Sequence, residues 1–270
     1  MRFIITLIAL LIERFFDWSH IRQWHWFNTF QKKVELRFAK LSHPLVFLLT
    51  ILPPVLMVAL VNHLLNGFVF GMLKLLFGIV VLMYCLGPQN FWAQAYICIT
   101  SLQGTDSQAA AETLRGMGVT LSKDPQGFHR SFTEALFGEA NRRVFAPLFW
   151  FVVLGPSGAV LYRCVDICRI NSGAAATQVQ RVLDWLPVRL LTFFFALGGH
   201  FVEVFKLWRH DVMTPPKAND ALLAECGIAG LDVVQSKQLP EDGSAEKEAV
   251  ALIDRAFVIG LVLLAISVLL

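Results

Sequence analysis

The chain has 270 residues, of which 56% are hydrophobic and 16% are charged, and its formal net charge is +3. The charged fraction is well below the roughly 25% of soluble domains, and the mean hydropathy is +0.60, so this composition indicates a membrane protein. A net charge this small, without a clustered basic stripe, argues against a nucleic-acid-binding function. The five cysteines are odd in number and form no C-x-x-C pair, which predicts reduced packing residues.

Residues 1–43 begin with a short apolar segment from Phe3 to Ile12. Its 10 residues make roughly 15 Å of helix, about half the hydrocarbon thickness of a bilayer. We expect it to dip into one leaflet or to pack on a helical bundle. From Glu13 to His43, aromatic residues are mixed with lysine and arginine, which favours an interfacial amphipathic helix on anionic lipid. Stacking on nucleic acid is the alternative, and it is less economical.

Residues 44–86 form a predicted transmembrane hairpin. Its spans run from Pro44 to Asn62, with a kink expected at Pro53 and Pro54, and from Gly67 to Leu86. Lys74 is expected near the middle of the second span, where it must face the bundle interior, pair with a carboxylate or snorkel to the interface. An intramembrane charge is a functional-site hypothesis by default, although a single residue is a weak signal.

Residues 87–143 are predicted to be a cytoplasmic helical region. No alternation of apolar and polar residues long enough for a strand occurs in it. Three helices are expected in this region, over Asn90–Leu102, Gln108–Gly116 and His129–Arg142. The residues Thr105, Asp106 and Ser107 offer amino-terminal caps for the second.

Residues 144–204 are predicted to hold two further spans joined by an amphipathic connection from Arg163 to Trp185. The first lies within Arg142–Val165, which has no charged residue between Arg143 and Arg163 and is long enough to cross the bilayer as a helix. Its glycines and prolines require cover from neighbouring protein, because lipid cannot replace a lost backbone hydrogen bond. The second runs from Leu186 to Val204, with Arg189 able to snorkel and with His200 and Glu203 on one helix face.

The carboxy-terminal part divides into a polar cytoplasmic region, residues 205–255, and an apolar tail, residues 256–270. The tail's 15 residues are expected barely to span a bilayer. Lysine and arginine are most frequent in residues 13–43, 87–143 and 205–255, so the positive-inside rule places these segments in the cytoplasm. The same rule places residues 63–66 and 163–185 outside.

Common catalytic and cofactor fingerprints are missing from the sequence. There is no G-x-x-x-x-G-K-[ST], G-x-G-x-x-G, H-E-x-x-H or G-x-S-x-G. His20 and His25 are five apart, a poor spacing for two metal ligands on one helix face. We therefore predict no cofactor and no metal site.

Charged residues occur at both ends of the Arg142–Val165 stretch and beyond it. The candidate polar site consists of Glu134, Glu139, Arg142, Arg143, Asp166, Asp184 and Arg189. Carboxylates and arginines at a membrane surface could bind an anionic substrate or a metal. The simpler interpretation is that the arginines anchor a helix end and that Glu139 pairs with Arg142 or Arg143.

Several runs resemble the AmpE family of bacterial inner-membrane proteins. They are A-P-L-F-W at Ala146–Trp150, G-P-S-G-A-V-L-Y-R at Gly155–Arg163 and L-D-W-L-P-V-R-L at Leu183–Leu190. The amino-terminal L-I-E-R-F-F at Leu11–Phe16 and the apolar tail also fit this family. The resemblance covers nearly the whole chain, and it implies an all-α polytopic membrane protein with a CbiB-like bundle of about four to five spans and cytoplasmic helical segments.

AmpE proteins are in turn similar to the CbiB/CobD membrane enzymes, which attach an aminopropanol arm to cobyric acid. Relative to the enzyme pattern, Glu134, Pro147, Tyr162, Pro187 and Arg189 are kept. Arg142 stands where an aspartate is expected, Asp166 and Ile167 stand where asparagine and threonine are expected, and only Asp184 remains of a group of two aspartates and an asparagine. Replacing a carboxylate by arginine reverses the local charge, so magnesium binding or proton transfer there would not survive.

The resemblance implies an inner-membrane sensory or signalling accessory protein, linked to β-lactamase induction and cell-wall recycling and without evident catalytic activity. Its expected partners are the lipid bilayer and another membrane or cell-wall-recycling protein, with no nucleic acid. A divergent CbiB-like enzyme forming amide bonds is the alternative, and a transporter is a third class that lacks support because no internal repeat is visible. An enzyme predicts a polar cavity where the acidic residues converge, whereas a scaffold predicts a direct Glu139–Arg142 pair.

Overall fold

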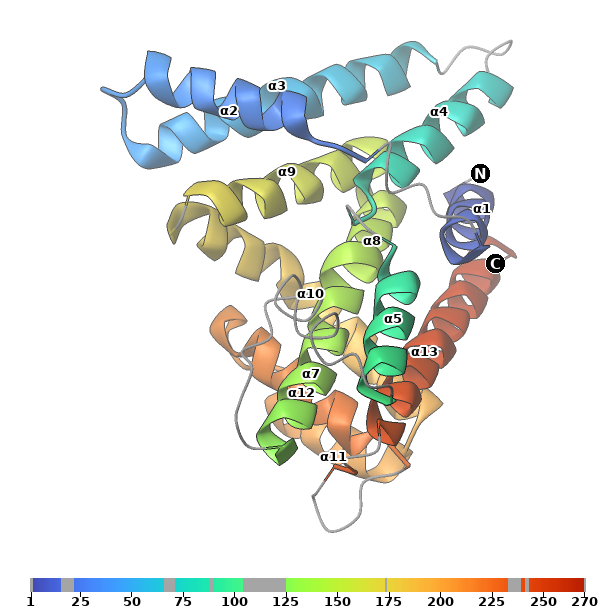
Figure 1. The fold of residues 1–270 in the computed structure, drawn as a ribbon. Coiled ribbons are helices and arrows are strands. Elements are labelled where there is room, and N and C mark those ends of the chain that lie inside the picture. Colours follow the sequence, from blue (N-terminus) through green and yellow to red (C-terminus); the bar gives the residue numbers. More distant parts are fainter. Residues whose placement is uncertain are drawn as a thin grey trace. The chain divides into compact units, whose positions relative to one another are not determined.

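The computed structural model describes residues 2–15, 22–65, 71–87, 90–103, 125–172, 174–232, 239–240 and 243–269 (Figure 1). Every regular element in these ranges is a helix, as predicted, and none is a strand. The helix predicted over residues 108–116 and its capping residues lie outside the described residues. The chain forms two compact units: unit 1 consists of Met1–Asn90 and Ala146–Asp184, and unit 2 of Phe91–Phe145 and Trp185–Leu270.

Unit 1 contains α1 (Arg2–Phe15), α2 (His25–Arg37), α3 (His43–Leu64), α4 (Gly71–Cys85), α8 (Ala146–Leu154), α9 (Pro156–Ser172) and the start of α10 (Ala174–Gly198). Helix α9 packs against α3, α4 and α8, and α1 packs against α4. At Gly78 an added Cβ would lie 2.7 Å from Ile5 Cδ1, so this glycine allows α1 and α4 to approach closely.

The stretch expected as one helix over residues 142–165 is divided at Gly155. This residue has a φ of +78°, a conformation that favours glycine, and Pro156 then opens α9. The break leaves carbonyls at the end of α8 without helical partners. The Arg2 guanidinium donates to two of them, Val152 O at 2.6 Å and Val153 O at 3.1 Å, so α1 closes the end of α8.

Unit 2 contains α5 (Phe91–Gln103), α7 (Pro125–Ala140), the π-helical turn η3 (Asn141–Phe145), the rest of α10, α11 (Phe201–Asp211), the 3₁₀ turn η4 (Pro216–Ala218), α12 (Asn219–Ala229) and α13 (Ser244–Leu269). Helix α7 packs against α12 and α13. The rings of Phe145, Phe194 and Phe257 form part of the core of unit 2. The ring centroid of Phe145 lies 5.9 Å from that of Phe194 and 6.1 Å from that of Phe257.

Helix α13 begins at Ser244, so the predicted short tail over residues 256–270 is wrong as a separate element. It is the second half of a 26-residue helix. The first half of α13 carries polar residues predicted from the sequence to lie in a water-exposed region, but two of them, Glu246 and Asp254, form contacts within unit 2. Glu246 is fully buried against His129, at 2.6 Å, and the Trp92 indole donates to Asp254 at 2.6 Å.

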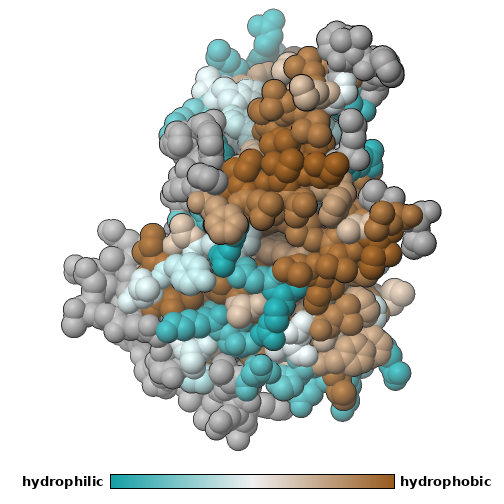
Figure 2. Space-filling view, turned by 90° about the vertical axis from the view of Figure 1, so that its right-hand side faces the viewer, coloured by the Kyte–Doolittle hydropathy of each residue, from teal (hydrophilic) through white to brown (hydrophobic). Residues whose placement is uncertain are grey.

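Among the described residues, two helices are long and apolar enough to cross a membrane: His43–Leu64 and Ser244–Ser267. Gly71–Cys85 is a shorter apolar helix. The space-filling view shows extensive hydrophobic surface on one face of the molecule (Figure 2). Helix α3 alone exposes apolar side chains along its length, among them Leu48, Leu52, Leu56 and Leu60.

Candidate functional site

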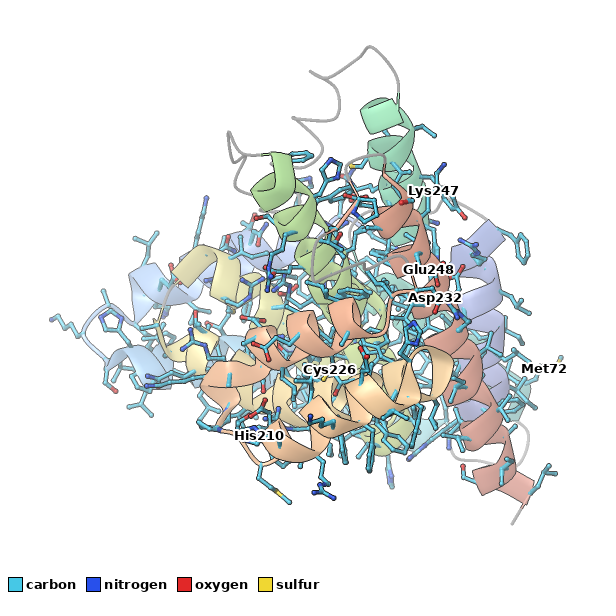
Figure 3. All side chains as sticks on the ribbon, turned by 90° about the horizontal axis from the view of Figure 1, so that it is seen from below. Met72, His210, Cys226, Asp232, Lys247 and Glu248 are labelled. Atoms are coloured by element: carbon cyan, nitrogen blue, oxygen red, sulfur yellow. The ribbon has the colours of Figure 1, made fainter. Side chains whose placement is uncertain are left out.

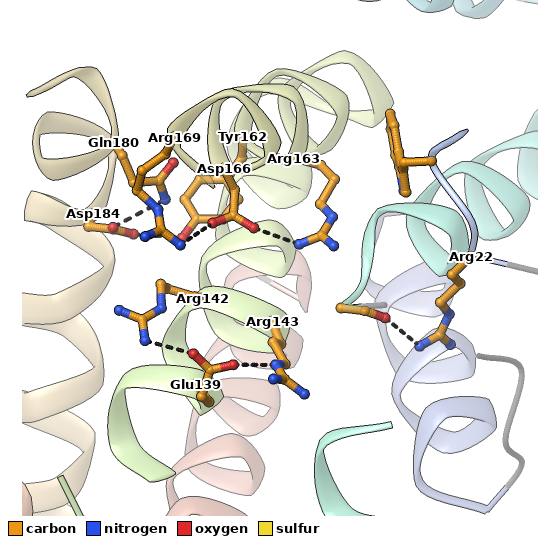
Figure 4. A network of polar contacts seen from close by, with 12 residues as sticks. Arg22, Glu139, Arg142, Arg143, Tyr162, Arg163, Asp166, Arg169, Gln180 and Asp184 are labelled. Atoms are coloured by element: carbon orange, nitrogen blue, oxygen red, sulfur yellow. Dashed lines mark hydrogen bonds and ion pairs between the residues drawn. The ribbon is translucent and has the colours of Figure 1, made fainter. Parts of the chain in front are cut away.

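The first polar cluster lies at the end of α7, where the helix widens into η3. Glu139 is 9% exposed, and each of its carboxylate oxygens accepts a hydrogen bond from an arginine (Figure 4). Arg142 Nη2 donates to Oε1 at 2.7 Å, and Arg143 Nε donates to Oε2. The pairing expected from the sequence is therefore present with both arginines. The negative charge of Glu139 is balanced inside the protein.

A charged groove lies between α7 and α12, beside this cluster. One wall is formed by residues at i, i+4 spacing, Arg130, Glu134 and Gly138 of α7 and Arg142 of η3. The other wall is formed by α12 residues: Asp220, Ala221, Leu223, Ala224 and Glu225. The hollow measures about 380 Å³, because glycine and alanine side chains leave the space between the helices open.

The charges of this groove are not all balanced by one another. Arg130 Nε donates to Glu134 Oε1 at 2.9 Å along the α7 wall. On the α12 wall Asp220 and Glu225 are exposed, and neither forms an ion pair with a residue that the structure describes. The opposite face of α12 is core, where burial, and then the charges of Glu225 and Asp211, raise the pKa of the Cys226 thiol to about 12.

The second polar cluster belongs to unit 1 and lies on α9. Asp166 is 4% exposed and receives Arg163 Nη1 at 2.7 Å and Arg169 Nη2 at 3.0 Å (Figure 4). The three residues are spaced three apart and so share one helix face. Asp166 is thus held between two guanidinium groups, as Glu139 is in unit 2.

Asp184, in the part of α10 that belongs to unit 1, is held by neutral partners. Its Oδ1 accepts a hydrogen bond from the fully buried Tyr162 hydroxyl at 2.7 Å, and its Oδ2 accepts one from Gln180 Nε2 at 3.2 Å. Sequence reasoning named Asp184 but missed both donors. Gln180 was detectable as the residue one turn earlier on the same helix, whereas Tyr162 is 22 positions away.

Arg189 does not snorkel, contrary to the prediction. It is 4% exposed, and its guanidinium stacks on Trp185 with Cζ 4.5 Å from the ring centroid. Its nitrogens donate to the carbonyls of Trp185, Val212 and Thr214 and to the Asn219 side chain. A guanidinium group has five N–H donors in a fixed geometry, so it can bind the several backbone acceptors that the turn between α11 and α12 presents. Arg189 holds that turn against α10.

Two other singled-out residues lie away from these clusters. Lys74 is the fourth residue of the described part of α4, which starts at Gly71, and its place near the middle of a span from Gly67 to Leu86 stays a prediction. His200 precedes α11 as its capping residue, and its Nε2 lies 2.9 Å from Asp232 Oδ1. Among the described residues, no group of three or more histidine, cysteine, aspartate or glutamate side chains could hold a metal ion.

The sequence matches the model of a known family over most of its length. The model of the CobD/CbiB proteins matches residues 6–237, which covers all the clusters described above. The chain belongs to the CobD/CbiB family. No solved structure significantly matches this family member.

Relatives of this CobD/CbiB family member carry two different names. A cobalamin biosynthesis protein CobD from Chromobacterium violaceum is 28% identical over 60% of this chain and 56% of its own length. A CobD from Stutzerimonas stutzeri is 30% identical over 42% of this chain and 41% of its own length. The chain thus spans about half the length of these CobD relatives. Protein AmpE from Shigella flexneri is 28% identical over 75% of this chain and 76% of its own length.

Proposed function

We propose that this chain is a multi-pass protein of the bacterial inner membrane that acts as an AmpE-like sensory or signalling accessory, linked to β-lactamase induction and cell-wall recycling. The likeness to AmpE spans three quarters of both chains, more than the likeness to either CobD relative above.

Exposed apolar surface supports the membrane location. Helix α3 has a mean hydropathy of 2.5 over its most apolar 18-residue window, only 22% of which is buried. The second half of α13 likewise exposes Val258, Val262, Leu263 and Ile266. Soluble monomers rarely expose contiguous apolar patches beyond a few hundred Å², so lipid is the natural cover for these helices.

The observation that carries the signalling role is the state of the buried acids. Glu139 and Asp166 are each held between two arginines, and Asp184 is held by Tyr162 and Gln180. A carboxylate whose two oxygens both accept hydrogen bonds from neighbouring side chains is held in place by the surrounding fold. These acids support the fold and not amide-bond chemistry.

A deletion experiment tests this proposal. We expect a strain of the encoding bacterium that lacks this chain to show altered β-lactamase induction by a β-lactam, and a plasmid copy to restore the normal response. The protein should stay in the membrane pellet after alkaline carbonate extraction. Unchanged induction together with release by carbonate would contradict both parts of the proposal.

A divergent CobD-type enzyme is the second candidate, and one observation favours it. Glu134, which the resemblance identifies as an enzyme-like position, lines the charged groove and is accessible from solvent. We expect this chain not to restore cobalamin-dependent growth in a strain without its own CobD protein, whereas the Chromobacterium violaceum CobD serves as the positive control. Growth that depends on this chain and is lost with Glu134→Gln would establish the enzyme and overturn the signalling proposal.

A further inference from the structure

Helix α11 carries an aromatic row that unit 2 does not fully cover. The rings of Phe201, Phe205 and Trp208 stack in series, with centroids 5.2 Å and 5.7 Å apart. Phe201 is 47% exposed and Val202 is 77% exposed, and Val204 is the buried residue of this helix. Lys206 and His210 lie on the face opposite this aromatic row, so α11 is amphipathic. Val202 is one turn before Lys206 and so belongs to the polar side of the helix.

The aromatic row leads into an apolar groove between α10 and α11. The two helices run antiparallel there, because Phe193 and Trp208 have ring centroids 5.4 Å apart and Arg189 reaches Val212 O. The groove holds about 310 Å³ and is lined by Trp185, Leu186, Arg189, Leu190, Phe193, Trp208, Val212 and Met213. The Arg189 guanidinium is turned toward backbone carbonyls, and Met213, at the rim, is 83% exposed. The open surface of the groove is therefore apolar.

The antiparallel pair of α10 and α11 forms a helical hairpin, and the place where this hairpin contacts α13 indicates what covers the groove. A Cβ on Gly198, at the end of α10, would lie 3.3 Å from Arg255 Cβ and 3.5 Å from Ile259 Cδ1. Arg255 is the last charged residue of α13, and only uncharged residues follow it. If α13 crosses the membrane, its charged-to-apolar boundary lies at the lipid headgroups. Helix α11 begins three residues after Gly198, at most about 10 Å along the chain from this level.

The hairpin also leaves α13 instead of following it through the bilayer. Figure 3 shows α11 running away from α13 toward the end marked by His210, and Figure 1 shows the same divergence. An amphipathic helix that starts at the headgroup level and runs away from the spanning helix is placed to lie in the plane of the interface. Tryptophan and phenylalanine on one face, with lysine and arginine elsewhere on the helix, are the residues that favour this position.

We propose that α11 is an interfacial membrane helix, with Phe201 and the groove rim at Met213 in contact with lipid acyl chains. This inference rests on the proposed membrane location of α13. It replaces the expectation that residues from 205 onward belong wholly to a soluble cytoplasmic region. The occupant of the groove is then an acyl chain of the bilayer, and not a second copy of the protein or a soluble ligand.

Spin labels on introduced cysteines test the proposal in nanodiscs of phosphatidylethanolamine and phosphatidylglycerol. The variants are Phe201→Cys and Met213→Cys on α11 and the turn that follows it, Val262→Cys on the apolar half of α13, and Ala221→Cys in the charged groove as the aqueous control. All four positions are solvent-accessible or exposed, and the five native cysteines are buried, so the unsubstituted protein provides the labelling blank. Collision rates with oxygen and with a neutral nickel chelate are measured for each label.

We expect the ratio of oxygen to nickel collisions at residues 201 and 213 to be severalfold higher than at residue 221 and similar to that at residue 262. Water-like ratios at 201 and 213, with a lipid-like ratio at 262, would overturn the interfacial helix and leave the membrane proposal standing. A water-like ratio at 262 would overturn the membrane location as well. Low collision rates with both reagents at 201 and 213 would mean that protein covers α11, which also overturns this inference.

Discussion

Glu139 and Glu225 are glutamates of the same compact unit, but their surroundings differ in a way that separates fold from ligand binding. Glu139 is buried, and both of its oxygens are occupied by arginine. Glu225 is exposed on the wall of an open groove and forms no ion pair with a described residue. The difference shows that an acidic residue in the sequence does not by itself mark a reactive site, because its surroundings decide whether its carboxylate is available to a ligand.

The contrast has an energetic basis. A buried carboxylate without a partner is costly, so the two arginines of Glu139 stabilise the folded state of unit 2. An exposed carboxylate is solvated by water and needs no protein partner. The buried cluster should therefore respond to mutation through stability, and the groove should respond only through what binds in it.

The largest effect is expected from Arg143→Met, which leaves Glu139 buried with only one arginine. Loss of one partner of a buried ion pair should lower the free energy of unfolding by about 3 kcal/mol. Arg130→Met is the matched control, because the Arg130–Glu134 pair has side chains 57% and 36% exposed and should contribute less than about 1 kcal/mol. Unfolding of both variants in detergent by denaturant measures the difference, and equal losses would contradict the comparison.

Two adjacent positions of α12 provide a kinetic form of the same comparison. The thiol of Cys226 has a pKa raised to about 12 by burial, whereas a cysteine placed at residue 225 should have a pKa near the ordinary value of about 8.5. A raised pKa lowers the thiolate fraction at pH 8, so Cys226 should be alkylated more than about a thousandfold more slowly than the cysteine of Glu225→Cys. Mass spectrometry after timed maleimide treatment measures both, and fast labelling of the unsubstituted folded protein at Cys226 would contradict the assignment of this face to the core.

The sequence predicted the long apolar helices well and the helix ends poorly. The helix predicted over Pro44–Asn62 is α3, His43–Leu64, because a continuous apolar run of this length favours one long helix. Helix α13 was cut short because Glu246 and Asp254 resemble solvent-exposed residues. Their partners, His129 and Trp92, are more than a hundred positions away, and no local pattern reports them.

The site shows the same division between local and distant contacts. The pairs of Glu139 follow i+3 and i+4 spacing and could be predicted. The contacts of Arg189 could not be predicted from the sequence, because its acceptors lie in a turn that only tertiary packing brings to α10. Snorkelling was therefore expected in their place. The charged groove was not foreseen, since it depends on α12 packing beside α7 through close contact of Gly227 with Phe137.

Gly227→Ala should have the next largest effect, because it tests what holds the groove walls together. An added Cβ would lie 2.5 Å from the ring of Phe137, which is fully buried and cannot move aside, so we expect a loss of about 1–3 kcal/mol. Gly138→Ala, on the opposite wall, is the matched control. Its Cβ would lie 3.4 Å from the mobile end of Arg142, and alanine favours the helix by up to about 1 kcal/mol. Thermal unfolding of both variants measures the two losses. A larger loss of stability for Gly138→Ala than for Gly227→Ala would contradict the role given to the Gly227–Phe137 contact.

The smallest effects are expected from the groove carboxylates themselves. Asp220 lies in the first turn of α12, so Asp220→Asn should lose only the favourable interaction with the helix dipole, about 0.3–0.5 kcal/mol. Glu225 lies beyond the first turn of α12 and has no such favourable interaction to lose, so Glu225→Gln should change the free energy of unfolding by less than about 0.5 kcal/mol. Denaturant unfolding of both, beside Glu139→Gln as the buried reference, measures the three values together. A loss above 1 kcal/mol for Glu225→Gln would mean that the groove carboxylate serves the fold as Glu139 does, and it would remove the reason to look for a ligand there.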